Sequence, residues 1–369
     1  MNKKSILYKT LSRALSVKRQ HLGKGVAMFT DWLEAHVPTH LQEHISYDAV
    51  GNLHVDARVD ATHRTLFVAH VDTVHRDDGA NKMRKTAAKW YADGAALGAD
   101  DGAGVAMLMH MLCAGVPAYY VFTQGEECGG IGAKHMAKDE ALLGQFDRAI
   151  AFDRRGIDSV ITHQGYGRCC SDEFAQALAD ELSSGNVLMY LGDDTGVYTD
   201  TAEFVDVIPE CTNISVGYMH EHSDREELNI YHFVALADAV LTVPWDSLPT
   251  TRDPAVLDSK WDWPEYDTPS GAWTKNWWAD YGKKITVVED TYEDMVEDAV
   301  YDALTGVYTH LIELMAECIY PEDPVLAKRS IRRAALTDEL LTDALVALRE
   351  GEDAENVLLW LYDEAYCEM

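Results

Sequence analysis

Short apolar runs that alternate with helical segments restrict most strongly how this chain can fold. The runs are rich in β-branched and aromatic residues, and they are long enough for buried strands but too short for helices. Strands that alternate with helices favour a layered sheet covered on both faces. The sequence therefore predicts an α/β fold, a three-layer mixed sheet flanked by helices. The predicted strands are 65–69, 118–123, 148–152 and 213–216, and the predicted helices are 102–113, 131–137, 171–183 and 228–241.

Other segments flank this alternating core. Residues 3–16 and 24–36 have apolar residues at helical spacing, and short strand-like pieces follow near residues 45 and 53–55. We assign residues 1–243, including N-terminal helices within 1–36, to one catalytic domain. Residues 244–288 are rich in Trp and Pro and predict an irregular strap packed on the body. Residues 289–369 predict an acidic α-helical extension, which is a candidate surface for a protein partner or self-association.

The charge of the chain excludes some classes of partner. The formal net charge is −31, although residues 1–30 contain Lys and Arg and no acidic residue. So acidic a body repels phosphate backbones, which argues against nucleic acid. We interpret the basic start as a solvated amphipathic helix rather than a membrane-surface segment, and no apolar run is long enough to span a membrane. Seven cysteines without a CxxC pair, and no signal peptide, favour a reduced, cytoplasmic setting.

Polar residues follow the predicted strands where each strand ends. In open α/β sheets, ligand sites form at the carboxyl ends of the strands. This shared location is the reason to treat these residues as one group. Its members are His70 and Asp72, Asp100 and Asp101 at a helix start, Glu126 and Glu127, Asp153, and His222 before the last core helix.

Each of these residues also has an ordinary structural explanation when taken alone. Asp100 and Asp101 can cap a helix, Glu126 and Glu127 can be a solvated loop pair, and Asp153 can pair with a following arginine. These explanations weaken together, because all would have to coincide at successive strand ends. Two imidazoles with several carboxylates suit zinc, or cobalt and manganese.

In this order, the segments resemble the dinuclear zinc exopeptidase superfamily. That superfamily includes peptidase T, related carboxypeptidases and deacylases, and leucyl-type aminopeptidases. Each motif is short, but their common order over about residues 40–243 is specific. The matching stretches are Ala-His-Val-Asp-Thr-Val at 69–74, Leu-Gly-Ala-Asp-Asp-Gly-Ala-Gly at 97–104, Thr-Gln-Gly-Glu-Glu-Cys-Gly at 123–129, Phe-Asp at 152–153 and His-Ser-Asp-Arg-Glu at 222–226, with support from 198–202 and 208–215.

The resemblance implies a site for two Zn²⁺ ions, with Co²⁺ or Mn²⁺ as alternatives. Asp100 would bridge the two ions. His70 and Asp153 would hold one ion, and Glu127 and His222 would hold the other.

The resemblance also implies catalytic roles. Asp72 would orient His70, as metal-bound histidines generally require. Glu126 would be the general base for a metal-activated water that attacks a peptide or amide carbonyl. The superfamily further suggests a cis peptide bond between Asp100 and Asp101.

We therefore expect a metallopeptidase, most simply an exopeptidase on short peptides. Aminopeptidase and carboxypeptidase activity both remain open. One alternative is a deacylase or amidase acting on small N-acyl compounds. Another is a catalytically idle metal-binding module that binds a partner.

The sequence departs from the superfamily pattern at several points. Gly102 stands where peptidase T and many relatives have Lys after the paired aspartates. The interval between Asp153 and His222 is too short for the separate lid domain of the peptidase T branch. His220 competes with His222, which we prefer because it keeps the His-Ser-x-x-Glu spacing. Lid residues commonly grip the substrate carboxylate, and candidates to replace them are Arg154, Arg155 and Arg168.

Truncation tests the predicted division of the chain. Residues 289–369 lie beyond the last matching motif and contribute none of the proposed ligands. A protein ending near Lys284 should still fold and bind metal, which circular dichroism and metal analysis would show. A folded, soluble truncated protein that binds no metal would contradict this division.

Overall fold

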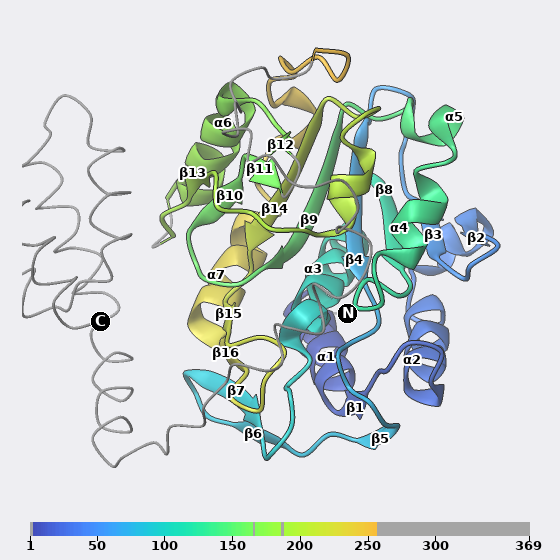
Figure 1. The fold of residues 1–369 in the computed structure, drawn as a ribbon, viewed down its shortest axis with the longest axis vertical. Helices are drawn as coiled ribbons and strands as arrows, with labels where there is room; N and C mark the ends of the chain where they lie inside the picture. Colours follow the sequence, from blue (N-terminus) through green and yellow to red (C-terminus); the bar gives the residue numbers. More distant parts are fainter. Residues whose placement is uncertain (1–2, 165–166, 186–187, 257–369) are drawn as a thin grey trace, which may run out of the picture. The chain divides into compact units, whose positions relative to one another are not determined.

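Residues 3–164, 167–185 and 188–256 are described by a computed structural model of the chain. Their centre is an eight-stranded mixed sheet in the order β13-β10-β14-β9-β4-β8-β3-β2 (Figure 1). The strands are β2 (Ile45–Tyr47), β3 (Leu53–Asp56), β4 (Thr65–His70), β8 (Tyr119–Thr123), β9 (Arg148–Arg154), β10 (Ser159–Ile161), β13 (Leu191–Asp193) and β14 (Glu210–Ser215).

The middle of this sheet is parallel. β4 pairs in parallel with β8 on one side and with β9 on the other, and β9 pairs in parallel with β14. β3 and β10 join this middle as antiparallel strands. The four parallel strands β4, β8, β9 and β14 therefore end at the same edge of the sheet. The loops that follow them start from that edge.

Helices cover both faces, because successive residues of the buried strands point in opposite directions. Phe67 and Ala69 of β4 pack in the larger core cluster, which includes residues of α1, α3, α6 and α7. Leu66 and Val68 pack in a second cluster with residues of α4 and α5. These helices are α1 (Lys3–Leu15), α2 (Lys24–Glu34), α3 (Ala99–Ala114), α4 (Ile131–Met136), α5 (Glu140–Leu143), α6 (Asp172–Ser183) and α7 (Ile230–Ala239).

Local signals set several helix ends. The side chain of Ser171 accepts a hydrogen bond from the Phe174 N–H and begins α6, and Asn229 does the same for His232 and α7. Gly115 ends α3 with φ of 83°, a conformation that favours glycine. These caps fix where the chain leaves each helix to return to the sheet.

Smaller pieces complete the described chain. One four-stranded sheet has the order β15-β16-β7-β6, and two pairs are β1 with β5 and β11 with β12. Their bounds are β1 (Val17–Lys18), β5 (Gly79–Ala80), β6 (Met83–Lys85), β7 (Lys89–Ala92), β11 (His163–Gln164), β12 (Gly167–Arg168), β15 (Tyr218–Met219) and β16 (Glu227–Asn229). Short 3₁₀ turns are η1 (Thr39–His44), η2 (Asp200–Phe204) and η3 (Trp245–Ser247).

The predicted α/β class with a mixed sheet between helices is confirmed. The predicted strands and helices all occur, with ends shifted by a few residues. No helix in the described part of the chain combines the length and apolar character that crossing a membrane requires. Most of the predicted strap 244–288, and the whole predicted extension 289–369, lie outside the described residues.

The aromatic centre of the larger cluster gives a stability prediction. The fully buried Phe67 ring lies 5.4 Å from the Tyr120 ring, 6.2 Å from Phe152 and 4.9 Å from Trp245, measured between centroids. Phe67→Ala should lower the free energy of unfolding by about 3–5 kcal/mol, since it leaves a cavity. Chemical denaturation measures this change. Val59→Ala is the control, because Val59 is 79% exposed and its loss should change stability by about 0.5 kcal/mol or less.

Candidate active site

The fold brings the predicted site residues together from separate loops at one edge of the central sheet. β4 ends at His70, and its parallel neighbour β9 carries Asp153 near its end. Parallel strands end at the same edge, so the loops that follow them meet there. The other members come from the first turn of α3 (Asp100), the turn after β8 (Glu126 and Glu127) and the loop after β15 (His222).

Asp100 lies between the two histidines. Its Oδ1 is 3.0 Å from His70 Nε2, and its Oδ2 is 3.1 Å from His222 Nε2. Asp153 Oδ1 lies 3.6 Å from His70 Nε2, and Glu127 Oε2 lies 3.1 Å from His222 Nε2. The side chains thus form two groups that share Asp100. Each group offers one imidazole nitrogen and carboxylate oxygens, which are donors that borderline divalent metals accept.

Glu126 lies beside the first group. Its Oε2 is 4.0 Å from His70 Nε2, farther than the nearest oxygens of Asp100 and Asp153. Its carboxylate is largely buried, as is that of the adjacent Glu127. The two neighbouring glutamates therefore approach the site differently, one beside each histidine.

Asp101 is oriented by the backbone. The peptide bond between Asp100 and Asp101 is cis, as the resemblance suggests. Asp101 Oδ2 accepts the His70 N–H at 3.1 Å, and Oδ1 accepts the Gly104 N–H at 3.0 Å. Asp101 also lies close enough to His70 and Asp153 to join a metal-binding group. We favour Asp100 as the shared ligand, because both oxygens of Asp101 already have backbone partners.

Asp72 stabilises the turn that carries the glutamates. Its Oδ1 accepts the N–H groups of Gly125 and Glu126 at 2.8 and 3.2 Å, and its Oδ2 accepts that of Glu127 at 3.3 Å. The His70 Nδ1 atom lies 3.7 Å from Asp72 Oδ1 and 3.2 Å from the Asp72 carbonyl oxygen. Asp72 therefore links the loop after β4 to the loop after β8.

Other buried groups hold the candidate ligands in place. The Asp153 carboxylate accepts hydrogen bonds from Thr199 Oγ1 at 2.7 Å and Tyr218 Oη at 3.0 Å. Glu226 accepts the N–H groups of Gly98 and Asp100, each at 3.0 Å. The sequence pointed only indirectly to these partners, since residues 198–202 and Glu226 lay within matching stretches. No local pattern marked Tyr218.

Burial and mutual repulsion shift the pKa values of the acids. Burial, together with the charges of Asp153, Asp200 and Glu127, raises the pKa of Glu126 well above its ordinary value despite His70. Burial and the Asp100 charge raise the pKa of Glu127 to about 7, although His222 opposes this.

The neighbouring carboxylates raise the pKa values of both histidines. Burial alone would lower the pKa of His222, but hydrogen bonds and charge from Asp100 and Glu127 raise it to about 11. Burial would also lower the pKa of His70, but Asp153, Asp100 and Asp72 outweigh burial and raise this pKa well above its ordinary value. The site therefore attracts positive charge strongly.

These donors fit metal ions. Glu127 Oε1 is buried and has no hydrogen-bond partner among the described residues, which is costly for a carboxylate oxygen. The cluster of His70, Asp100 and Glu127 brings one donor atom from each residue within 4.8 Å of the others. A cation bound there would supply the missing partner and offset the repulsion between the acids.

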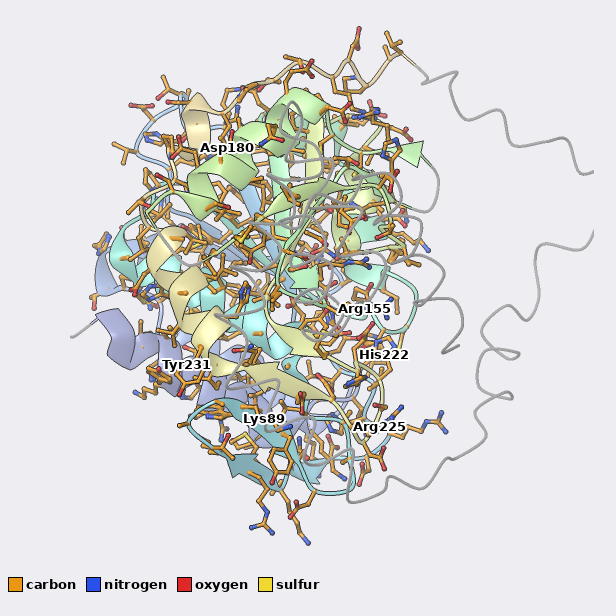
Figure 2. All side chains as sticks on the ribbon, turned by 90° about the vertical axis from the view of Figure 1, so that its left-hand side faces the viewer. Lys89, Arg155, Asp180, His222, Arg225 and Tyr231 are labelled. Atoms are coloured by element: carbon orange, nitrogen blue, oxygen red, sulfur yellow. The ribbon has the colours of Figure 1, made fainter. Side chains whose placement is uncertain are left out.

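The other candidates lie differently. His220 is exposed, and its carbonyl oxygen accepts Ser223 Oγ at 2.6 Å. Arg168 pairs with Asp172 at 2.7 Å, while Arg154 Nη2 donates to Thr195 Oγ1 at 3.0 Å. Arg155 is half-exposed, pairs with Glu221 at 3.0 Å and lies on the same side of the molecule as His222 and Arg225 (Figure 2).

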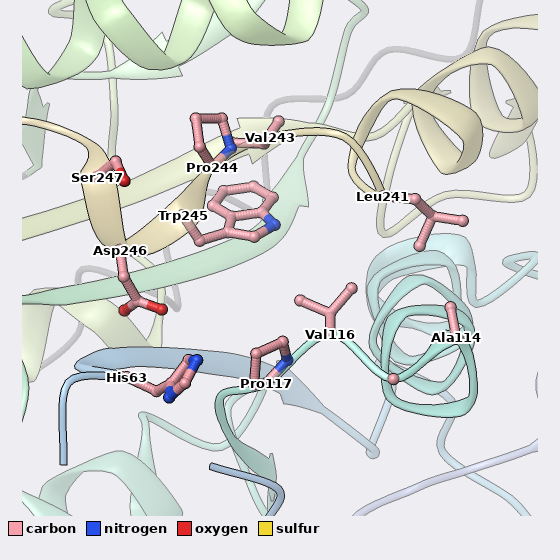
Figure 3. Close-up of a pocket in the computed structure, with 11 residues that line it drawn as sticks. His63, Ala114, Val116, Pro117, Leu241, Val243, Pro244, Trp245, Asp246 and Ser247 are labelled. Carbon is pink, nitrogen blue, oxygen red and sulfur yellow. The ribbon is translucent and has the colours of Figure 1, made fainter. Parts of the chain in front are cut away.

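A separate cavity of about 390 Å³ lies near the opposite ends of the strands (Figure 3). Its lining includes Pro117, just before β8, and Trp245 and Asp246 of η3. Asp246 Oδ1 accepts the Thr65 Oγ1 hydroxyl at 2.9 Å at the start of β4. The six residues of β4 span about 20 Å, so this cavity is distinct from the candidate metal-binding groups.

Sequence comparison identifies no relative: no protein-family model matches the chain, and no curated protein matches it. Solved structures do match its fold. The aminopeptidase PepT from Bacillus cereus has a TM-score of 0.54 and 14% identity, over 66% of this chain and 98% of that one. An aminopeptidase from the archaeon Desulfurococcus kamchatkensis has a TM-score of 0.51 and 13% identity, over 66% and 95%.

The TET1 peptidase of Pyrococcus horikoshii has a TM-score of 0.51 and 15% identity, over 64% of this chain and 98% of that one. That peptidase can assemble into a tetrahedron or a large octahedral shell. The predicted resemblance is thus confirmed at the level of architecture: the chain shares its fold with these solved aminopeptidases and with the TET1 peptidase.

Proposed function

We propose that this protein is a metal-dependent peptidase, an exopeptidase that acts on short peptides with two zinc ions. The observation that carries the proposal is the position of Asp100, whose two oxygens lie 3.0 and 3.1 Å from His70 and His222. The fold shared with solved aminopeptidases supports it. His70, Asp153 and Asp100 would hold one ion, and His222, Glu127 and Asp100 the other.

When bound, the two ions would polarise the scissile carbonyl and make a water in the site more acidic. Glu126 would take the proton of that water and return it to the leaving amine. The charge of bound cations would oppose the burial and the neighbouring carboxylates that raise the pKa of Glu126, so that its carboxylate could be ionised when it accepts this proton. Asp72 keeps Glu126 in position through the backbone of its turn.

The substrate's free terminus would lie at the exposed side of His222. Of the arginines considered for the substrate carboxylate, Arg155 has the position that suits this role, because its partner Glu221 precedes His222 directly. Glu221 in the same pair can instead receive a free amine. Dipeptides, tripeptides, peptides blocked at either end and N-acyl amino acids, each tested with zinc, cobalt and manganese, separate amino- and carboxypeptidase from deacylase activity.

Metal analysis tests the proposal most directly. Protein purified without chelator and reloaded with zinc should bind two ions per chain. A chain that retains only trace metal and cleaves no member of the panel would instead be a binding module.

Asp100 should be the residue on which both metals depend. A bridging carboxylate contacts both ions and offsets their mutual repulsion, so Asp100→Ala should lose both. Asp101→Ala is the matched control and should lose fewer, because Asp101 is bound to backbone N–H groups. Metal stoichiometry of the two folded variants measures the difference. Two zinc ions retained in Asp100→Ala would show that Asp100 does not bridge.

The two glutamates should separate catalysis from metal binding. Glu126→Gln keeps the shape of the side chain but cannot accept a proton, so turnover should fall about 10²–10⁴-fold while both metals stay bound. Glu127→Gln should instead lower metal occupancy. Turnover and metal stoichiometry are measured together on each variant. Near-normal turnover of Glu126→Gln on a substrate that the wild type cleaves would rule out its role as base.

A further inference from the structure

Arg19 is a fully buried arginine beneath the candidate metal site, and the motifs do not include it. It follows β1, in the connection between α1 and α2. Its guanidinium donates from Nε to the Val71 carbonyl at 2.7 Å and from Nη2 to the Gly98 carbonyl at 3.1 Å. Nη1 donates to the Ala14 carbonyl at the end of α1.

These carbonyls belong to the loops that carry the candidate ligands. Val71 lies between His70 and Asp72, and Gly98 lies two residues before Asp100. The backbone adds to the connection, because the Thr73 N–H donates to the Arg19 carbonyl oxygen at 2.8 Å. One side chain therefore joins the loop after β4 to the first turn of α3.

Arg19 also brings positive charge to a site with too little of it. Burial lowers its pKa, and the carboxylates of Asp101, Glu226, Asp72 and Asp100 raise it, giving a pKa of about 10. The guanidinium therefore stays charged at neutral pH. The Arg19 hydrogen bonds go to carbonyl oxygens, so the carboxylates remain available to other partners. The positive charge of Arg19 still attracts these carboxylates electrostatically.

The neighbouring backbone leaves room for this guanidinium. A Cβ atom at Gly102 would lie 3.0 Å from Arg19 Nη2 and 3.2 Å from both Ala14 Cβ and Leu15 Cδ2. Any larger residue at 102 would thus push against Arg19 and α1. This gives a physical reason for glycine directly after the paired aspartates, where the sequence departs from the superfamily pattern.

We propose that Arg19 is a positioning residue that acts as the built-in countercharge of the metal site. It stabilises the carboxylates most when no metal is bound, and less once metal ions supply positive charge. This inference rests on the proposed metal-binding function. It adds the N-terminal segment to the unit that supports the site, although the resemblance begins only near residue 40.

The test compares thermal unfolding of the full chain in chelator and in excess zinc. Arg19→Gln removes the charge and keeps an amide donor, whereas Arg19→Lys keeps the charge. In Arg19→Gln the melting temperature should fall mainly without metal, so that the rise on adding zinc exceeds that of the wild type by about 4 °C or more. In Arg19→Lys the rise should equal that of the wild type, even where both temperatures fall.

Arg148→Gln is the matched control. Arg148 is also buried, and it lies at the start of β9, away from the candidate metal-binding groups. Its guanidinium donates to the Leu248 carbonyl and to Thr250 Oγ1. Its loss should lower both melting temperatures equally and leave the zinc-dependent rise unchanged.

The outcomes separate this inference from the proposed function. A wild type without any zinc-dependent rise would overturn metal binding itself. A wild-type rise that is the same in Arg19→Gln and Arg19→Lys would overturn only the countercharge role. If Arg19→Gln fails to fold without zinc while Arg19→Lys folds, the charge is what matters and the inference stands. If neither folds in either condition, the hydrogen-bond geometry is decisive and the inference falls.

Discussion

Repulsion between buried carboxylates is the constraint on which the site depends. Asp100, Asp153, Glu126 and Glu127 converge where parallel strands end, and two histidines lie among them. Two like charges 4 Å apart repel by about 4 kcal/mol at an effective dielectric constant of 20. A fold that kept these acids together without cations would have to protonate some of them, and the raised pKa values of Glu126 and Glu127 express that tendency. Divalent ions would relieve the repulsion without moving the carboxylates.

Apart from Arg19, the surrounding structure orients the acids but neutralises them little. Thr199 and Tyr218 donate hydroxyl groups to Asp153, and backbone N–H groups serve Asp72, Asp101 and Glu226. Such neutral donors fix direction and carry no net charge. The fold thus sets the geometry of the site and leaves most of the charge compensation to whatever binds there. A site of this kind is well defined in shape, and its excess of carboxylates suits a cation.

The parts of this arrangement that local sequence determines were predictable. The β4, β8 and β9 strands appear as short apolar runs because both of their faces are buried, and the candidate ligands lie at or just after their carboxyl ends. β10 and β13 were missed because each has only three residues, too few for a pattern. Tyr218 and Arg19 were missed for a different reason, since their roles arise from contacts with residues far away in the chain. An arginine in a basic N-terminal segment has the sequence context of a solvated surface residue.

Helix α1 shows how packing connects such a residue to the site. Ala14 and Leu15 are fully buried and approach the first turn of α3 so closely that a Cβ at Gly102 would lie 3.2 Å from each. That contact fixes the end of α1, and Arg19, which follows four residues after Leu15, then lies beneath the loops of His70 and Asp100. The position of the guanidinium is therefore a consequence of helix packing, not of a motif. For that reason, the structural unit that supports the candidate metal centre begins at α1, well before the first residue that a ligand motif would identify.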